Sequence, residues 1–188
     1  MKTFGRVLTA MITSFNEDGS VNIENTVAIA QHLLDHGSDG LVVCGTTGEN
    51  PTISRESKIA LFKAIAKAYG DKGTIIANVG SNDTKGSVDF VKEVSAIPGI
   101  DGLLVVVPYY NKPNQQGQYL HFKSIAEATT LPIMVYNVPG RVGTGIFPAT
   151  LARLHKEYPH ICAIKEASGN LMIASEIKRL MPNDDFMV

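Results

Sequence analysis

The chain has 188 residues, of which 44% are hydrophobic and 19% charged, and its formal net charge is −1. This composition is typical of a globular protein with a sizeable core, and no basic block or acidic tail points to a nucleic acid or a membrane surface as a partner. The longest aliphatic run, residues 103–107, is too short to span a bilayer.

The seven strand-like runs recur at regular intervals. They begin near Arg6, Gly40, Thr74, Gly102, Ile133, Ile161 and Phe186. Helical patterns separate them, at residues 23–35, 55–68, 84–96, 115–128, 148–157 and 171–179. Strand then helix, repeated six times, predicts a parallel α/β architecture, either a doubly wound open sheet or a (β/α)8 barrel.

The placement of the polar residues favours the barrel. Polar segments follow strands two, three, four and five, and a lysine lies in strand six. An open sheet gathers its chemistry mainly at one crevice, whereas a barrel gathers it from the C-terminal ends of nearly all its strands. We therefore predict an α/β fold, a (β/α)8 TIM barrel of which this chain holds six βα units and the start of strand seven.

The number of strands predicts that this barrel is incomplete. A TIM barrel needs eight strands and about 250 residues, whereas the chain stops inside a seventh apolar run, at residues 186–188. We expect residues 1–188 to be one catalytic barrel domain that lacks its last strands and a C-terminal helical region. On this view the chain is part of a longer polypeptide.

The two cysteines indicate the cellular compartment in which the protein works. Cys44 and Cys162 both lie in apolar, strand-like runs, which predicts buried free thiols in a reducing environment. Residues 1–13 also lack the long apolar stretch and cleavage site of a signal peptide. We therefore expect a cytoplasmic protein.

The run at residues 161–167 sets a lysine into a strand. Strict alternation puts Ile161, Ala163 and Lys165 on one face. If helices cover both faces, desolvation favours the neutral amine, which can attack a carbonyl and form a Schiff base. The alternative is a lysine whose ammonium extends from the strand end to water.

Two further segments could contact a substrate. Gly45-Thr46-Thr47-Gly48-Glu49 offers hydroxyls and backbone N–H groups that suit a carboxylate, or it is a plain turn with a helix cap. Residues 108–113 form a rigid turn with two adjacent tyrosines. A tyrosine hydroxyl there could relay a proton, or the pair could be interface aromatics.

The segment 136–141 puts Tyr136 at the end of strand five and Arg141 in the following loop. Arginine suits bidentate binding of a substrate carboxylate, although it could also be a simple surface residue. The glycines of residues 140–145 reverse the dinucleotide spacing and give little support to a nucleotide site.

The histidines do not predict a metal or triad site. His32 and His36 have a spacing that can hold zinc, but no third ligand stands in a matching motif, which favours a solvated helix face. The other three, His121, His155 and His160, form no triad pattern with serine or cysteine.

Four segments together resemble the dihydrodipicolinate synthase family, in the family's order and spacing. They are Gly-Thr-Thr-Gly-Glu (45–49), Pro-Tyr-Tyr-Asn-Lys-Pro (108–113), Tyr-Asn-Val-Pro-Gly-Arg (136–141) and Ile-Lys-Glu-Ala-Ser-Gly-Asn (164–170). The resemblance covers nearly the whole chain and corresponds to the N-terminal portion of the family. It implies a class I aldolase-type barrel with no metal and no organic cofactor.

The resemblance assigns four catalytic residues. Lys165 would form the Schiff base with pyruvate, and Tyr136 would move protons to and from that intermediate. Thr46 and Tyr110 would complete a hydroxyl relay with Tyr136. In the family, the counterpart of Tyr110 reaches across a dimer interface into the neighbouring site.

The resemblance also assigns substrate binding and product. Thr47 would hold the pyruvate carboxylate, and Arg141 would guide the second substrate, aspartate 4-semialdehyde. The product would be 4-hydroxytetrahydrodipicolinate, on the route to diaminopimelate and lysine. Family members imply a homodimer or homotetramer for the full-length protein.

Two alternatives stay open. N-acetylneuraminate lyases and other sugar-acid pyruvate aldolases share the lysine and the strand-five tyrosine, although Arg141, the double tyrosine and Thr47 favour the synthase. The second alternative is an inactive barrel fragment or a non-catalytic module.

One departure from the family concerns feedback regulation. Lysine-inhibited members carry a histidine and a glutamate where this chain has Arg55 and Gly86, although Asn82 and Tyr109 remain. The resemblance therefore implies weak or absent inhibition by lysine.

Overall fold

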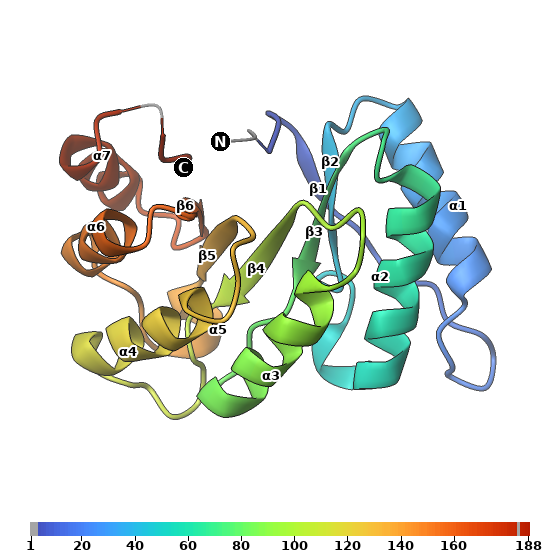
Figure 1. The fold of residues 1–188 in the computed structure, drawn as a ribbon, viewed down its shortest axis with the longest axis horizontal. Helices are drawn as coiled ribbons and strands as arrows, with labels where there is room; N and C mark the ends of the chain where they lie inside the picture. The colour runs from blue at the N-terminus through green and yellow to red at the C-terminus, as the bar shows by residue number, and fades with distance from the viewer. Residues whose placement is uncertain (1–3, 184) are drawn as a thin grey trace. The chain divides into compact units, whose positions relative to one another are not determined.

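The computed structural model describes residues 4–183 and 185–188, in which strands and helices alternate (Figure 1). The strands are β1 (Leu8–Ala10), β2 (Gly40–Val43), β3 (Thr74–Asn78), β4 (Gly102–Val106), β5 (Ile133–Asn137) and β6 (Ile161–Glu166). The helices are α1 (Ile23–Asp35), α2 (Arg55–Tyr69), α3 (Thr84–Ser95), α4 (Gln115–Ala126), α5 (Pro139–Val142), α6 (Pro148–Glu157) and α7 (Leu171–Leu180), with a 3-10 turn η1 (Asn50–Thr52).

The helix predictions are confirmed closely. Helices α1 and α6 have the predicted bounds, and the other four begin where predicted and end within two residues of the predicted position. Side-chain caps explain several of the starts, because Asn22, Ser54, Asn114 and Asn170 each accept a hydrogen bond from a backbone N–H of the first turn. The short elements α5 and η1 were not predicted, because a single turn carries no hydrophobic period.

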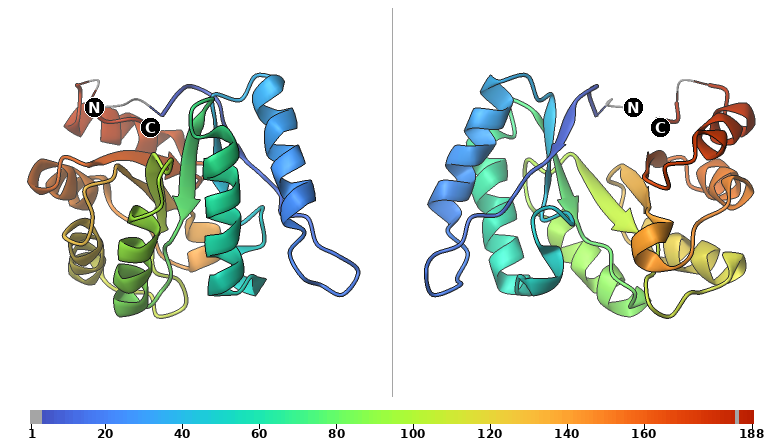
Figure 2. Two further views of the ribbon diagram at one scale, coloured as in Figure 1. Left: turned by 45° about the vertical axis from the view of Figure 1, so that its right-hand side comes forward. Right: turned by 180° about the vertical axis from the view of Figure 1, so that it is seen from behind.

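The described residues divide into two compact units. The first extends to Asn78 and adds Glu93–Leu103, and the second contains Val79–Lys92 and Leu104–Val188. In the first unit β1, β2 and β3 pair in parallel. Helices α1 and α2 lie side by side and pack against β2 and β3 (Figure 2).

The pairing of β2 with β3 depends on a glycine. A Cβ at Gly40 would lie 2.5 Å from the carbonyl oxygen of Thr74, so no other residue fits without a shift of the backbone. Every residue of β2 and of β3 is buried. Burial of consecutive residues means that both faces of these strands are covered, as in α/β proteins.

In the second unit β5 pairs with β6 in parallel, α4 contacts α6, and α6 contacts α7. The predicted seventh strand is present as a parallel bridge between Ala163 and Met187. Two backbone bonds hold it, from Met187 N to Cys162 O and from Ile164 N to Met187 O, both 2.9 Å long.

The strand order identifies the fold. The strands follow one another in the sheet in the order β1-β2-β3-β4-β5-β6. A doubly wound sheet interleaves its strands, whereas a (β/α)8 barrel keeps them in sequence order. The prediction of a TIM-barrel arrangement with six βα units is therefore confirmed.

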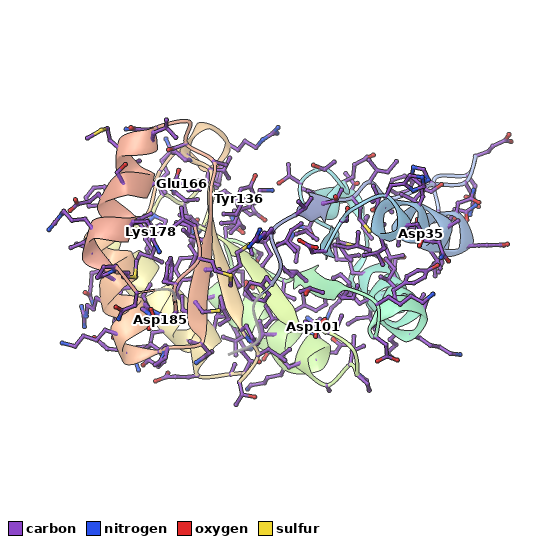
Figure 3. All side chains as sticks on the ribbon, turned by 90° about the horizontal axis from the view of Figure 1, so that it is seen from above. Asp35, Asp101, Tyr136, Glu166, Lys178 and Asp185 are labelled. Carbon is purple, nitrogen blue, oxygen red and sulfur yellow. The ribbon has the colours of Figure 1, made fainter. Side chains whose placement is uncertain are left out.

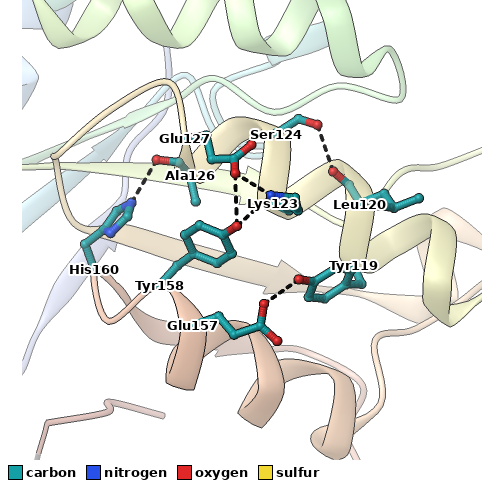
Figure 4. A network of polar contacts seen from close by, with 9 residues as sticks. All are labelled: Tyr119, Leu120, Lys123, Ser124, Ala126, Glu127, Glu157, Tyr158 and His160. Carbon is teal, nitrogen blue, oxygen red and sulfur yellow. Dashed lines mark hydrogen bonds and ion pairs between the residues drawn. The ribbon is translucent and has the colours of Figure 1, made fainter.

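A polar network joins α4 to the end of α6 (Figure 4). The hydroxyl of Tyr119 donates to Glu157 Oε2 at 2.5 Å, and the guanidinium of Arg153 lies 3.7 Å from the centre of the Tyr119 ring. Tyr158 bonds to Lys123 and to Glu127. These contacts fix the outer faces of the two helices against each other.

A buried histidine makes the stability of this unit depend on pH. His121 in α4 is only 3% exposed, and its Nδ1 lies 2.8 Å from the hydroxyl of Thr84. Burial lowers the pKa of His121 to about 4, and the negative charge of Asp83 opposes this effect. The imidazole is therefore neutral in the folded protein at pH 5, where it is protonated in the unfolded chain.

We expect this difference to weaken the fold in acid. Between pH ~6.5 and ~4 only the unfolded chain takes up this proton, so the free energy of unfolding should fall by up to about 3 kcal/mol as the pH decreases. Urea denaturation at pH 7 and pH 4 measures the change. In His121→Gln this part of the pH dependence should disappear, and an unchanged dependence would contradict the assignment.

Candidate functional site

Two predicted catalytic residues face each other in the second unit. Lys165 in β6 pairs directly with Tyr136 in β5, and the Nζ of Lys165 lies 4.5 Å from the centre of the tyrosine ring. Tyr136 is 6% exposed, and Lys165 is partly buried. In Figure 3, Tyr136 marks the end of β5. An amine beside a phenol on one face of a sheet places a nucleophile next to a proton donor.

An irregularity between β5 and β6 produces this pairing. Ile133 pairs with Ile161, but Met134 pairs with Ala163, so Cys162 is an extra residue in β6. Beyond this β-bulge Ala163 and Lys165 share one face of β6, as predicted, and the register adds that this is the face of Met134 and Tyr136 in β5. The prediction that Ile161 lies on that face is wrong, because its partner Ile133 points to the opposite side of β5 from Met134.

Sequence reasoning missed a second pair that follows directly. Asn137 pairs with Glu166, and the Nδ2 of Asn137 donates to Glu166 Oε2 at 2.7 Å. Asn137 is 1% exposed. A carboxylate next to the lysine and a buried amide next to the tyrosine were the available signals, but only the register of β5 and β6 brings them together.

Arg141 lies in the one-turn helix α5, directly after β5, and its side chain is exposed. Gly143 ends this helix in the left-handed conformation, with φ of 75°. The loop that follows is anchored to α4, because Gln115 donates to Gly145 O at 2.8 Å and accepts from Phe147 N at 2.9 Å. The glycines of residues 140–145 thus serve a helix end and a packed loop.

The double tyrosine lies in the segment after β4. Tyr110 is 88% exposed and has φ of 69°, a conformation that a residue other than glycine rarely adopts. Asn111 Nδ2 donates to the carbonyl of Asn82 at 3.1 Å, which ties this segment to the residues before α3. The side chain of Tyr110 is thus directed to solvent, and its relay role stays a prediction.

Thr46 and Thr47 belong to the first unit, in the turn after β2, and both are exposed. Bonds on either side hold this turn: Thr13 donates to Gly48 O, and Asn78 donates to Cys44 O, both at 2.8 Å. The turn leads into η1 before α2 begins. The roles predicted for the two hydroxyls stay predictions.

The described residues contain no group of three or more His, Cys, Asp or Glu side chains placed to hold a metal ion. His32 and His36 stack at 4.1 Å, and His36 Nδ1 lies 2.7 Å from the carbonyl of His32. Cys44 and Cys162 are buried free thiols, as predicted. Burial raises the pKa of Cys44 to about 12 and that of Cys162 to about 11, so both stay protonated near neutral pH.

A surface cavity of about 850 Å³ lies elsewhere in the second unit, between the end of α6 and residues 180–183 and 185. None of the predicted site residues lines it. The candidate site therefore lies at the strand ends, outside this cavity. In the part of the chain that the structure describes, no helix is both long and apolar enough to cross a membrane.

Comparisons with known proteins show a close match over nearly the whole chain. The sequence model of the Dihydrodipicolinate synthetase family matches residues 3–188. A 4-hydroxy-tetrahydrodipicolinate synthase from Desulforamulus reducens is 51% identical over 181 residues, which cover 96% of this chain and 61% of that protein. The chain thus spans about three fifths of the length of this curated relative.

Solved structures extend the similarity to the fold. A dihydrodipicolinate synthase from Bacillus anthracis matches 99% of this chain and 63% of its own, with a TM-score of 0.95 and 42% identity. A structure from Cyanidioschyzon merolae with lysine bound matches 98% of this chain and 62% of its own, with a TM-score of 0.93 and 43% identity.

Proposed function

Since the chain belongs to the Dihydrodipicolinate synthetase family, we propose that it carries the Schiff-base site of a 4-hydroxy-tetrahydrodipicolinate synthase. The reaction condenses pyruvate with aspartate 4-semialdehyde to give 4-hydroxytetrahydrodipicolinate, in the biosynthesis of diaminopimelate and lysine. The single observation that supports it best is the pairing of Lys165 with Tyr136.

The proposed chemistry begins at Lys165. Its Nζ adds to the ketone carbon of pyruvate, and one amine proton moves to the ketone oxygen. The carbon–oxygen bond then breaks as water leaves, which gives a protonated imine. Tyr136 donates the proton that the departing oxygen needs. Loss of a proton from the methyl carbon then gives an enamine, which attacks the aldehyde carbon of aspartate 4-semialdehyde while the aldehyde oxygen takes up a proton. The amine of that substrate then adds to the imine carbon and displaces Nζ of Lys165, which closes the ring and frees the lysine. The imine nitrogen accepts the electrons, so the proposal includes no metal or organic cofactor.

Four other residues have proposed roles. Thr46 and Tyr110 pass protons to and from Tyr136, and Thr47 binds the pyruvate carboxylate. Arg141 binds the carboxylate of the second substrate, for which an exposed guanidinium directly after β5 is suited.

We also propose that the protein works in the cytoplasm as a homodimer or homotetramer. Two buried free thiols suit a reducing compartment. Two neighbouring apolar side chains at the start of α7 support self-association, because Leu171 is 82% and Met172 74% exposed.

Trapping with borohydride tests the proposal. The protein is incubated with pyruvate and reduced, and the intact and peptide masses are measured. We expect a pyruvyl adduct on the peptide that contains Lys165. Added aspartate 4-semialdehyde should consume the bound pyruvate, whereas release of pyruvate from N-acetylneuraminate would instead support a sugar-acid lyase. Absence of any adduct would contradict the Schiff-base site.

A separate prediction concerns lysine. The guanidinium of Arg55 binds Glu93 Oε2 through Nε at 2.9 Å and through an Nη at 2.8 Å. At Gly86 a Cβ would lie 2.5 Å from the carboxylate of Asp83. Because neither position offers a carboxylate or an imidazole to an amino acid, we expect no saturable binding of lysine in a calorimetric titration. The Cyanidioschyzon merolae protein serves as the positive control, and comparable heats from both proteins would refute the prediction.

A further inference from the structure

We propose that Asn137 and Glu166 are positioning residues that hold Lys165 opposite Tyr136, an inference that rests on the proposed function. Each of the two follows a catalytic residue in its strand, and the two side chains bond to each other at 2.7 Å. Glu166 marks the end of β6 in Figure 3.

The two side chains form the middle of a chain of three hydrogen bonds that joins four residues. The backbone N–H of Ile146 donates to Asn137 Oδ1 at 3.2 Å, and Asn137 Nδ2 donates to Glu166 Oε2. Glu166 Oε1 accepts from the backbone N–H of Ser168 at 2.7 Å. The chain thus joins the end of β5, the end of β6 and the loops that follow both strands.

This chain of bonds requires one amide and one carboxylate. Both of its ends are backbone N–H donors, those of Ile146 and Ser168, so the two side chains must accept at both ends and still bond to each other. An amide supplies one acceptor and one donor site, and a carboxylate supplies two acceptors. Two amides would leave two donors face to face, and two carboxylates would repel each other.

The bonds act on Lys165 and Tyr136 through the backbone. Successive residues of a strand point to opposite faces, so Asn137 and Glu166 lie behind the pair that carries the chemistry. The backbone N–H of Ala167 adds a bond of 2.8 Å to the carbonyl of Asn137. The β-bulge at Cys162 interrupts the pairing at the other end of these strands. The side-chain bond therefore reinforces the backbone ladder at the end next to Lys165.

Three variants test the proposal by exchanging the two groups. Glu166→Gln leaves two amides in place, Asn137→Asp leaves two carboxylates, and the double variant Asn137→Asp/Glu166→Gln restores one of each with the direction of the central bond reversed. In the double variant, both backbone donors again have acceptors. Glu176→Gln is the matched control, because it removes a carboxylate that pairs with Arg179 on the surface of α7.

The reactivity of Lys165 is measured in two ways. The first is the rate at which pyruvate is trapped on Lys165 by borohydride. The second is the rate at which a general amine-acylating reagent labels Lys165, relative to Lys67, an exposed lysine of α2. The second measurement does not depend on pyruvate, so it tests the positioning role even if the proposed function fails.

We expect each single variant to change both rates at Lys165 by about ten-fold or more, because small displacements of reacting groups have large effects on rate. In the double variant both rates should recover to within about three-fold of those of the original protein. In Glu176→Gln both rates should equal those of the original protein. A circular dichroism spectrum of each variant separates positioning from a general loss of stability, and the double variant remains informative if a single variant does not fold. Unchanged labelling in both single variants, or a double variant as impaired as the singles, would overturn the proposal.

Discussion

Arginine in place of Lys165 should abolish the capture of pyruvate. The guanidinium keeps a positive charge and a similar length, so the partly buried position and the contact with the Tyr136 ring remain filled. It stays protonated at any working pH and has no free electron pair with which to attack a carbonyl. We therefore expect Lys165→Arg to show no adduct above background in the borohydride experiment, together with an unchanged circular dichroism spectrum.

The control is an exposed lysine of the same unit. Lys92 lies on α3, and Lys92→Arg should trap pyruvate as the original protein does. If Lys165→Arg still formed an adduct, peptide mapping would locate the true nucleophile at another lysine, and the assignment of Lys165 would be wrong.

The second large effect should follow the removal of a single hydroxyl. Tyr136→Phe keeps the ring that packs beside Lys165 and deletes the proposed proton donor. Loss of a positioned general acid costs about 10²–10⁴-fold in rate, so we expect pyruvate trapping to slow by at least about 10²-fold. A time course of quenched samples measures the rate. A rate within a few-fold of the original would assign the proton transfer to another group.

Tyr119 provides a comparison for stability. Tyr119 is also nearly buried, at 5% exposed, but its hydroxyl donates to Glu157 in the network between α4 and α6. Tyr119→Phe should lower the free energy of unfolding by about 1 kcal/mol and leave the trapping rate unchanged. The two substitutions thus separate loss of a catalytic group from loss of a structural bond.

The arrangement of strands and helices was predictable because each long element has a local sequence pattern of apolar residues and capping residues. Buried strands such as β2 and β3 are short apolar runs, and the caps at Asn22 and Ser54 mark helix starts. Elements of one turn, such as α5, carry no such period. The sequence order of the strands in the sheet followed only from where the polar residues lie.

The candidate site was predictable in its residue types and less so in its geometry. Lys165 and Tyr136 were found because each ends a strand with a reactive group. Their direct pairing depends on the extra residue in β6, and a β-bulge has no clear signature in one sequence. The bond between Asn137 and Glu166 was missed for the same reason, because it exists only in that register.

The β-bulge in β6 also determines which changes in chain length this strand can accept. Cys162 is a surplus residue in the ladder with β5, so its deletion would straighten the ladder and leave Lys165 opposite Tyr136. Deletion of Ile164, two positions later, would pair Lys165 with Val135 instead of Tyr136 and turn the lysine side chain to the other face of the sheet. A homologous sequence that lacks one residue before Ala163 in this strand can therefore keep the same chemistry.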